Sequence, residues 1–296
     1  MTEAVASAGE KNRSTGWALA AAGMLFVSTD SLFIRLAETS TWNIAFVVAC
    51  FSLPILLGLA WRFDDRASWT NIRRDARPLV LVGLLASVSQ IAFIGAVKQT
   101  AVANVVTIVA SAPIIAAVIA WLILGEQTTR RVWNAIGITV IGIAVVVLGS
   151  LGQPSLDGDL LALLAILAFG ASINVWRRNP DMSVFLGLAL STTTMLAISA
   201  FLVDLAVVDT RALLAAIGMG AVFNPLGRIC HASSPRYAPA AEVALFTPVE
   251  TVAAPIWAWL AFREAPPLQT FIGAVIIVLG VLYGTVLPSL LRRSPA

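Results

Sequence analysis

The chain has 296 residues, of which 59% are hydrophobic and 12% are charged, and its mean hydropathy is +0.90. Soluble proteins carry about 25% charged residues, so this composition excludes a soluble globular protein and indicates a membrane protein. The formal charge of +3 is small and gives no reason to expect a nucleic-acid partner.

Ten apolar segments follow one another along the chain, each near the roughly 20 residues that a helix needs to cross the hydrocarbon. We place them at 17–36, 42–61, 78–97, 101–124, 132–149, 158–176, 183–203, 212–229, 239–262 and 268–288. The first is too long for a signal peptide, so we interpret it as a retained helix. The expected fold is an all-α integral membrane protein with ten transmembrane helices, an N-terminal tail over 1–16 and a C-terminal tail over 289–296.

Positive residues alternate in density between successive connections. With the N-terminus inside, only Arg35, Lys98, Arg211 and Arg263 of the 19 Lys and Arg residues lie outside. The cytoplasmic set is Lys11, Arg13, Arg62, Arg66, Arg73, Arg74, Arg77, Arg130, Arg131, Arg177, Arg178, Arg228, Arg236, Arg292 and Arg293. Positive loops remain in the cytoplasm during insertion, so we expect both termini there. The excess of Arg over Lys and the abundant Ala point to a GC-rich bacterial genome and hence to an inner membrane.

Polar side chains recur at helical spacing within several spans, which places them on single helix faces. Polar groups inside a membrane are costly and usually face protein or a water-filled cavity. The side chains that we expect in a cavity are Ser87, Gln90, Asn104, Thr107, Ser111, Ser172, Asn174, Asn224, Phe246 and Glu250.

Glu250 is the sharpest of these candidates. It lies eleven residues into the ninth span, about 16 Å along the helix and near mid-membrane. It either binds a substrate ammonium or carries a coupling proton. The alternative is a structural hydrogen bond in a helix made irregular by Pro248 and Pro255.

Three other charged residues are gating or coupling candidates. Asp30, in the outer third of the first span, either contributes to the outer mouth or pairs with Lys98 or Arg35 near the surface. Arg228 and Glu242 lie near the inner ends of the eighth and ninth spans. They either form a salt bridge that closes an inner gate, or each extends toward the cytoplasmic headgroups; the second interpretation is favoured.

Proline and tryptophan mark further features. Pro113, Pro225, Pro248 and Pro255 are predicted to break helices, because proline removes a backbone hydrogen bond. Trp17, Trp42, Trp61, Trp133 and Trp176 lie at span ends, as in the aromatic belt of membrane proteins. The lone histidine, His231, is expected to have a plain polar role at a helix end.

The sequence contains an internal repeat. Sliding it by 138 positions aligns 98–126 with 236–264, including a Trp-Leu pair and a terminal Glu in each copy, and the same offset pairs Gln90 with Arg228. Each half holds five helices, an odd number, so the halves must have opposite orientations. Inverted repeats of this kind give secondary transporters two interconvertible states around a central site.

The five-plus-five arrangement resembles the EamA branch of the drug/metabolite transporter superfamily. The fourth span reads Ser-Ala-Pro at 111–113 and ends Leu-Gly-Glu at 124–126. The ninth reads Pro-Val-Glu-Thr at 248–251, then Ala-Pro-Ile-Trp-Ala-Trp-Leu at 254–260, and ends Phe-Arg-Glu at 262–264. The departures are Thr251, where many relatives carry Pro, and Arg263, where Gly is usual.

The resemblance implies two EamA-like repeats, at 17–150 and 157–288, with amino-acid exporters of the YddG type as the nearest analogues. In those exporters the cavity is walled by helices 1, 3, 4, 6, 8 and 9. The other four helices are peripheral.

We therefore expect a secondary transporter that exports amino acids, aromatic or other apolar ones included, or related small metabolites, by alternating access. The alternatives are a drug, cation or nucleotide-sugar carrier of the same superfamily, and a membrane scaffold without transport. A nucleotide-sugar carrier needs several basic groups in its cavity, and only Arg228 is a candidate, at an expected peripheral position. We expect a monomer with no enzymatic activity, no cofactor and no metal, whose partners are a small-molecule substrate and the lipid bilayer.

Overall fold

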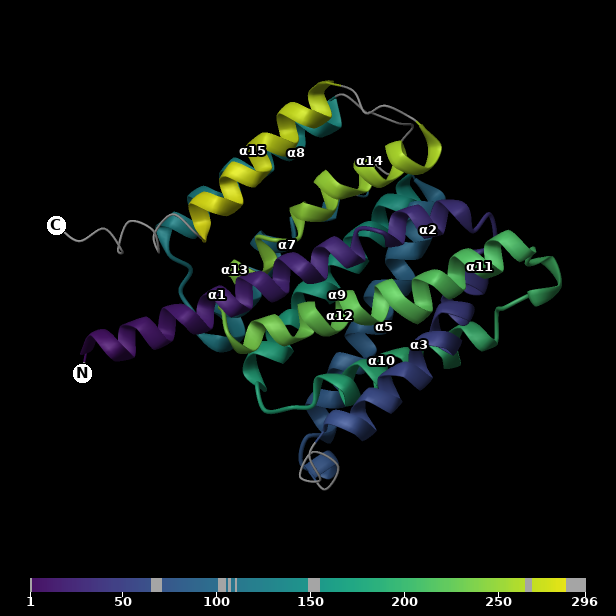
Figure 1. Cartoon of the computed structure of the whole chain (residues 1–296), viewed down its shortest axis with the longest axis horizontal. Coiled ribbons are helices and arrows are strands. Elements are labelled where there is room, and N and C mark those ends of the chain that lie inside the picture. Colours follow the sequence, from purple (N-terminus) through teal and green to yellow (C-terminus); the bar gives the residue numbers. More distant parts are fainter. Residues whose placement is uncertain are drawn as a thin grey trace.

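The computed structural model describes residues 2–64, 71–100, 105, 108–109, 111–148, 155–263 and 268–285, and every regular element within these ranges is a helix (Figure 1). The helices of the first half are α1 (Thr2–Val27), α2 (Asp30–Leu36), α3 (Thr41–Phe63), η1 (Asn71–Arg73), α5 (Ala76–Gln99), α7 (Ala112–Ile119), η2 (Ala120–Leu124) and α8 (Arg130–Leu148). Those of the second half are α9 (Leu156–Arg178), α10 (Val184–Ala200), η3 (Leu205–Val207), α11 (Thr210–Gly218), η4 (Met219–Phe223), α12 (Asn224–Ser233), η5 (Ser234–Arg236), α13 (Ala240–Ala244), α14 (Pro248–Phe262) and α15 (Leu268–Gly284).

Six helical segments in the described part are long and apolar enough to cross a membrane. They are Arg13–Leu36, Thr41–Phe63, Ala76–Gln99, Leu156–Arg178, Thr210–Arg236 and Ala240–Ala261, and three shorter apolar helices are Ala112–Leu124, Val184–Ala200 and Phe271–Gly284. Large apolar side chains such as Trp61 and Phe201 are more than four-fifths exposed, as expected of a surface that faces lipid. The chain is a multi-pass membrane protein; the count of ten spans and the side of the termini stay predictions.

The first span is not one continuous helix, contrary to the prediction for 17–36. Ser28 and Thr29 separate α1 from α2. Their hydroxyls donate to the carbonyl oxygens of Leu25 and Phe26, three residues earlier. Such side-chain bonds to nearby carbonyls compete with regular helix geometry. The indole Nε1 of Trp257 on α14 donates to Ser28 Oγ at 2.8 Å and ties this break to the ninth span.

The eighth and ninth spans are also irregular at mid-length. Five residues of π-helix, η4, precede α12, whose second residue is Pro225. A turn at 245–247 separates α13 from α14, whose first residue is Pro248. Proline is tolerated in the first turn of a helix because its missing N–H has no partner there in any case.

The other two predicted breaks differ in form. Pro113 lies in the first turn of α7, directly after a turn at Ser111. The prediction for Pro255 is wrong, because α14 runs on through it to Phe262. One lost hydrogen bond is a local cost, and the turns on either side keep the helix continuous.

The packing of the helices follows the internal repeat. If the spans are numbered one to ten, then α3 with α10, α8 with α15 and α7 with α13 are contacts between counterpart spans two and seven, five and ten, and four and nine. The contact of α5 with α9 has its counterpart in that of α12 with α1. Each half therefore packs onto the other in the pattern that a two-fold exchange of the halves requires.

Glycines let one counterpart pair approach closely. In Figure 1, α8 and α15 lie along each other. A Cβ at Gly142 would lie 2.9 Å from the carbonyl oxygen of Gly273 and 2.9 Å from the backbone nitrogen of Ile277. A Cβ at Gly280 would lie 2.8 Å from the side chain of Thr139. These backbones touch, so small residues are required at the contact.

Candidate substrate cavity

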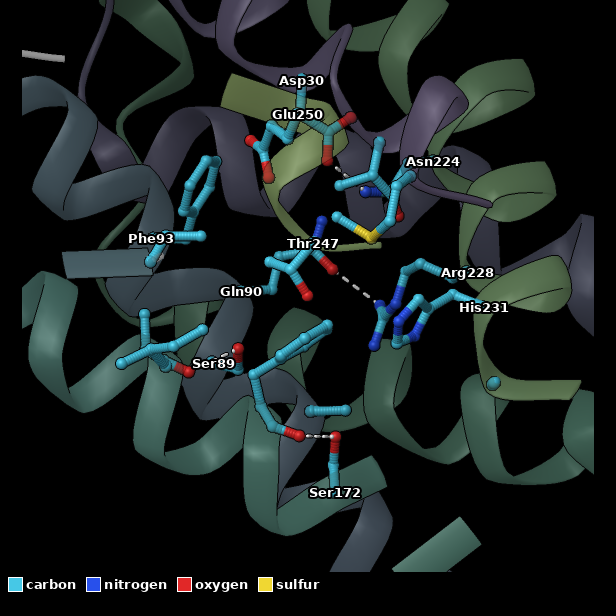
Figure 2. Close-up of a pocket in the computed structure, with 18 of the residues that line it drawn as sticks. Asp30, Ser89, Gln90, Phe93, Ser172, Asn224, Arg228, His231, Thr247 and Glu250 are labelled. Atoms are coloured by element: carbon cyan, nitrogen blue, oxygen red, sulfur yellow. Dashed lines mark hydrogen bonds between the residues drawn. The ribbon is translucent and has the colours of Figure 1, made fainter. Parts of the chain in front are cut away.

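A cavity lies where the two repeats meet (Figure 2). Its empty volume is about 870 Å³, counting the space at its open mouth. The wall is built by residues of α1, α2, α5, α9, α12 and α14, together with Val109, Thr247 and Leu188 of α10. These belong to the first, third, fourth, sixth, eighth and ninth spans, with a single residue from the seventh. All three mid-span irregularities, in the first, eighth and ninth spans, lie along this wall.

Two carboxyl groups lie together at one end of the cavity. Asp30, the first residue of α2, is 3% exposed, and Glu250, in the first turn of α14, is 6% exposed. The amide of Asn224 donates to Asp30 Oδ2 at 2.9 Å, and Asp30 Oδ1 has no hydrogen-bond partner among the described residues. Figure 2 shows the Glu250 side chain beside Asp30, turned toward the same space. The helix breaks before Asp30 and before Pro248 bring these two acids to one place.

The guanidinium of Arg228 lies on the same wall, one helical turn beyond Asn224. It donates to Gln90 Oε1 at 2.7 Å and to Ser191 Oγ at 2.9 Å. Neither partner is charged. The prediction that Arg228 is peripheral is therefore wrong: Gln90 and Ser191 hold it against the cavity, and it forms no bond with Glu242.

Gln90 and Arg228 are 138 positions apart, which is the offset that superposes the two repeats. Two equivalent positions can touch only where the symmetry axis passes between them. Their hydrogen bond therefore marks the pseudo-two-fold axis of the molecule. Binding sites of inverted-repeat transporters lie at this repeat interface, near the middle of the membrane.

Several polar atoms on the cavity wall are buried without a hydrogen bond to any described residue. They are Oδ1 of Asp30, Nε2 of Gln90, Nε2 of His231 and Oγ1 of Thr247. Nearly all buried polar atoms in proteins are hydrogen-bonded to protein, water or ligand. A cluster of such atoms around one space is typical of a site that accepts polar ligand groups.

His231 departs from its prediction. Its ring packs against Phe169 with centroids 4.9 Å apart, and the residue is 7% exposed and lines the cavity. It lies two residues before the end of α12, as the sequence indicates, but η5 continues the span beyond it, so it is enclosed.

The other predicted cavity residues fall into three groups. Gln90, Ser172, Asn224 and Glu250 line the cavity; Ser87, Ser111, Asn174 and Phe246 do not; Asn104 and Thr107 lie outside the described residues. The hydroxyls of Ser87 and Ser111 donate to carbonyl oxygens three residues earlier in the chain. The amide of Asn174 donates to Ala116 O at 3.2 Å and joins α9 to α7, while Phe246 belongs to an apolar core cluster.

Glu242 has partners other than the predicted one. Its Oε2 accepts a hydrogen bond from Trp17 Nε1 at 3.0 Å, and its Oε1 lies 3.9 Å from a guanidinium nitrogen of Arg13. The residue is 4% exposed. The salt bridge to Arg228 is therefore not formed in this structure, and the favoured expectation of extension toward headgroups is also wrong, because α1 covers the side chain.

Trp176 was assigned to the interfacial belt and is instead buried, with 4% exposure. Its ring lies against Gly187 of α10, where a Cβ would come within 2.4 Å of it, and it also lines the cavity. Thr247 and Ser89 also line the cavity, although neither is among the residues predicted from the sequence. The position of Thr247 directly before Pro248 was the available signal, because a proline-initiated helix places the preceding residue in a turn.

A second polar cluster joins the two halves at one end of the molecule. Arg177 Nε donates to Glu126 Oε1 at 2.9 Å, and another nitrogen of the same guanidinium donates to the carbonyl oxygen of Pro235 at 3.2 Å. Arg177 lies in the last turn of α9, Glu126 follows the fourth span, and Pro235 precedes the ninth. The positive-residue pattern assigns all three to the cytoplasmic side.

The structure is that of a multi-pass membrane protein with a cavity between two repeats. The model of the EamA-like transporter family matches residues 14–148 and again 156–285. The chain therefore belongs to the EamA-like transporter family of the drug/metabolite transporter superfamily.

Solved structures share the fold. In all, 29 chains match; one of them, a crystal structure, has a TM-score of 0.78 and 15% identity, over 95% of this chain and 100% of that chain. At this identity the likeness shows the fold alone. No functionally curated protein matches the chain.

Proposed function

We propose that the protein is a secondary transporter that exports amino acids, or closely related small metabolites, by alternating access. The observation that carries this proposal is the cavity at the junction of the repeats, which combines an apolar wall with both signs of charge.

The proposed orientation in the membrane follows from the charge pattern, because short positive connections remain cytoplasmic, and it places both termini inside. The excess of Arg over Lys and the abundant Ala support a bacterial inner membrane as the setting. Amino-acid exporters of the YddG type remain the nearest functional analogues. We propose a monomer without a cofactor, because one chain supplies both halves of the cavity and transport is driven by a substrate or proton gradient.

The decisive experiment is uptake of labelled amino acids into proteoliposomes that hold the purified full-length chain, with and without an imposed pH gradient. We expect saturable uptake of apolar amino acids. Flux without the gradient identifies a facilitative carrier, and flux that requires it makes Glu250 the first candidate for the proton carrier. Folded protein that moves no amino acid in either condition overturns the substrate proposal.

A carrier for drug cations is the second candidate, because Asp30 and Glu250 provide more negative charge than Arg228 offsets. Uptake of lipophilic amines in preference to amino acids would favour it. A nucleotide-sugar carrier is less well supported, because Arg228 is the single Lys or Arg on the described cavity wall. A scaffold without transport would show no substrate-dependent flux.

A further inference from the structure

We propose that the cavity binds its substrate as a zwitterion at two poles. Asp30 and Glu250 would receive the ammonium group, and Arg228 the carboxylate. This inference rests on the proposed function as a carrier of amino acids or related metabolites, and it adds the ionic form and the orientation of the bound molecule.

The acidic pole is built to accept hydrogen bonds. One oxygen of Asp30 is taken by Asn224, and the other has no described partner. The Glu250 side chain lies beside Asp30 and faces the same space. An ammonium group carries three donors and finds acceptors on both carboxyl groups at this end of the cavity.

The basic pole holds its charge in place without neutralising it. Arg228 is fixed by the amide oxygen of Gln90 and the hydroxyl of Ser191, both of which are neutral. A guanidinium has five N–H donors, so donors remain for an anion. Planar guanidinium groups are well suited to carboxylates.

The two poles lie on neighbouring turns of the cavity wall. Asn224, which holds Asp30, precedes Arg228 by four residues on α12, which is about one helical turn. A single small zwitterion would have to bridge this separation. The remaining wall is largely apolar, with Phe93, Ile166 and Phe169, and leaves an apolar side chain in contact with apolar surface.

Both signs of charge are present on the cavity wall, with two carboxyl groups and one guanidinium. A free amine offers no partner to the guanidinium, and a free acid offers none to the carboxyl groups. Burying an unpaired charge is costly. A zwitterion pairs both signs in one binding event.

The test is leucine counterflow in proteoliposomes that hold the full-length chain, with two competitors that share the isobutyl side chain of leucine. Isoamylamine is leucine without its carboxylate, and N-acetylleucine is leucine without its ammonium charge. We expect each to inhibit at least tenfold less strongly than unlabelled leucine, since each loses a charge-assisted hydrogen-bonded pair.

Two variants then assign the poles. In Arg228→Gln, the inhibition constants of leucine and isoamylamine should lie within about threefold of each other. Arg228→Lys keeps the charge and should retain part of the preference for leucine over isoamylamine. Glu250→Gln should narrow the preference for leucine over N-acetylleucine. Matched controls are Arg178→Gln and Asp157→Asn, exposed residues away from the cavity, and size-exclusion profiles should show that every variant is folded.

The outcomes separate the two proposals. If folded wild-type protein carries leucine, but isoamylamine and N-acetylleucine compete as strongly as unlabelled leucine does, the two-pole arrangement is wrong and the proposed function stands. The two-pole arrangement is also wrong if Arg228→Gln and Glu250→Gln each weaken inhibition by leucine, isoamylamine and N-acetylleucine by the same factor. If wild-type protein carries no leucine, the amino-acid function itself fails, and this inference with it.

Discussion

The hydrogen bond between Asn224 and Asp30 connects α12 of the second repeat to α2 of the first, inside the membrane. Asn224 is 2% exposed and Asp30 is 3% exposed. Loss of the amide leaves a buried carboxylate oxygen without its donor, and such a loss costs about 1–3 kcal/mol.

Asn224→Ala should therefore lower the thermal stability of the purified protein, with a free-energy cost of about 1–3 kcal/mol. Asp30→Ala should cost a similar amount, and the double variant less than the sum, because either change removes the same bond. Denaturation in detergent measures all three. Strictly additive losses would show that the bond contributes nothing measurable.

For single residues, the sequence predicts which polar side chains lie within the spans better than it predicts which residues they contact. Helical spacing correctly places Asn224 and His231 on one face of the eighth span, but in the third span Gln90 lines the cavity and Ser87 does not. The hydroxyls of Ser87 and Ser111 donate to backbone carbonyl oxygens on the preceding turn of their own spans, as serines in helices often do. A polar residue in a span therefore need not face the cavity. Arg228 is a predicted gating candidate, but its predicted position is wrong. An arginine near a helix end ordinarily extends to the headgroups, and the glutamine that holds it against the cavity comes from the third span.

Irregular helices surround the cavity, and each has a different local cause. Hydroxyl-to-carbonyl bonds break the first span, a π-helical turn precedes Pro225 in the eighth, and Pro248 starts a new helix in the ninth. The proline signals can be read from sequence, while the hydrogen bond that joins the break at Ser28 to Trp257, more than 200 residues away, cannot. Such breaks are where carriers present backbone groups to substrate and bend.

We expect Pro248→Ala to lower transport several-fold without loss of thermal stability. An alanine restores an N–H and favours a continuous ninth helix, which straightens the segment that carries Thr247 and Glu250. Transport in proteoliposomes and a melting curve of the same sample measure the two effects. A fall in stability together with transport would show that the proline serves packing.

The contact between α8 and α15 offers a matched pair of glycines on one helix. A methyl group at Gly142 meets backbone atoms of α15 at 2.9 Å, whereas nothing lies within 4 Å of one at Gly137. Gly142→Ala should therefore destabilise the protein by about 1–3 kcal/mol. Gly137→Ala should be neutral or stabilising by up to about 1 kcal/mol, since alanine favours helix. Equal melting temperatures for the two variants would contradict the close packing.

The whole molecule is two halves that exchange roles, and its ends must open in turn. Glu126, Arg177 and the Pro235 carbonyl join the halves at one end. If alternating access separates these segments, a covalent link between them must stop the cycle.

Glu126→Cys with Arg177→Cys, in a chain whose Cys50 and Cys230 are replaced, should lose nearly all flux when oxidised. Addition of a reductant should restore the flux of the reduced double variant, which serves as the control. Oxidised protein with undiminished flux, and a cross-link verified by mass, would show that this end stays closed throughout transport.

The bond between Gln90 and Arg228 also makes the two halves of the molecule unequal. Equivalent positions of the repeats hold a neutral carboxamide in one half and a guanidinium in the other. Two glutamines could face each other here, because a carboxamide both donates and accepts, whereas two guanidiniums side by side repel. An arginine at one of these positions therefore requires a different residue at the other, and the positive charge on the cavity wall belongs to the second half alone.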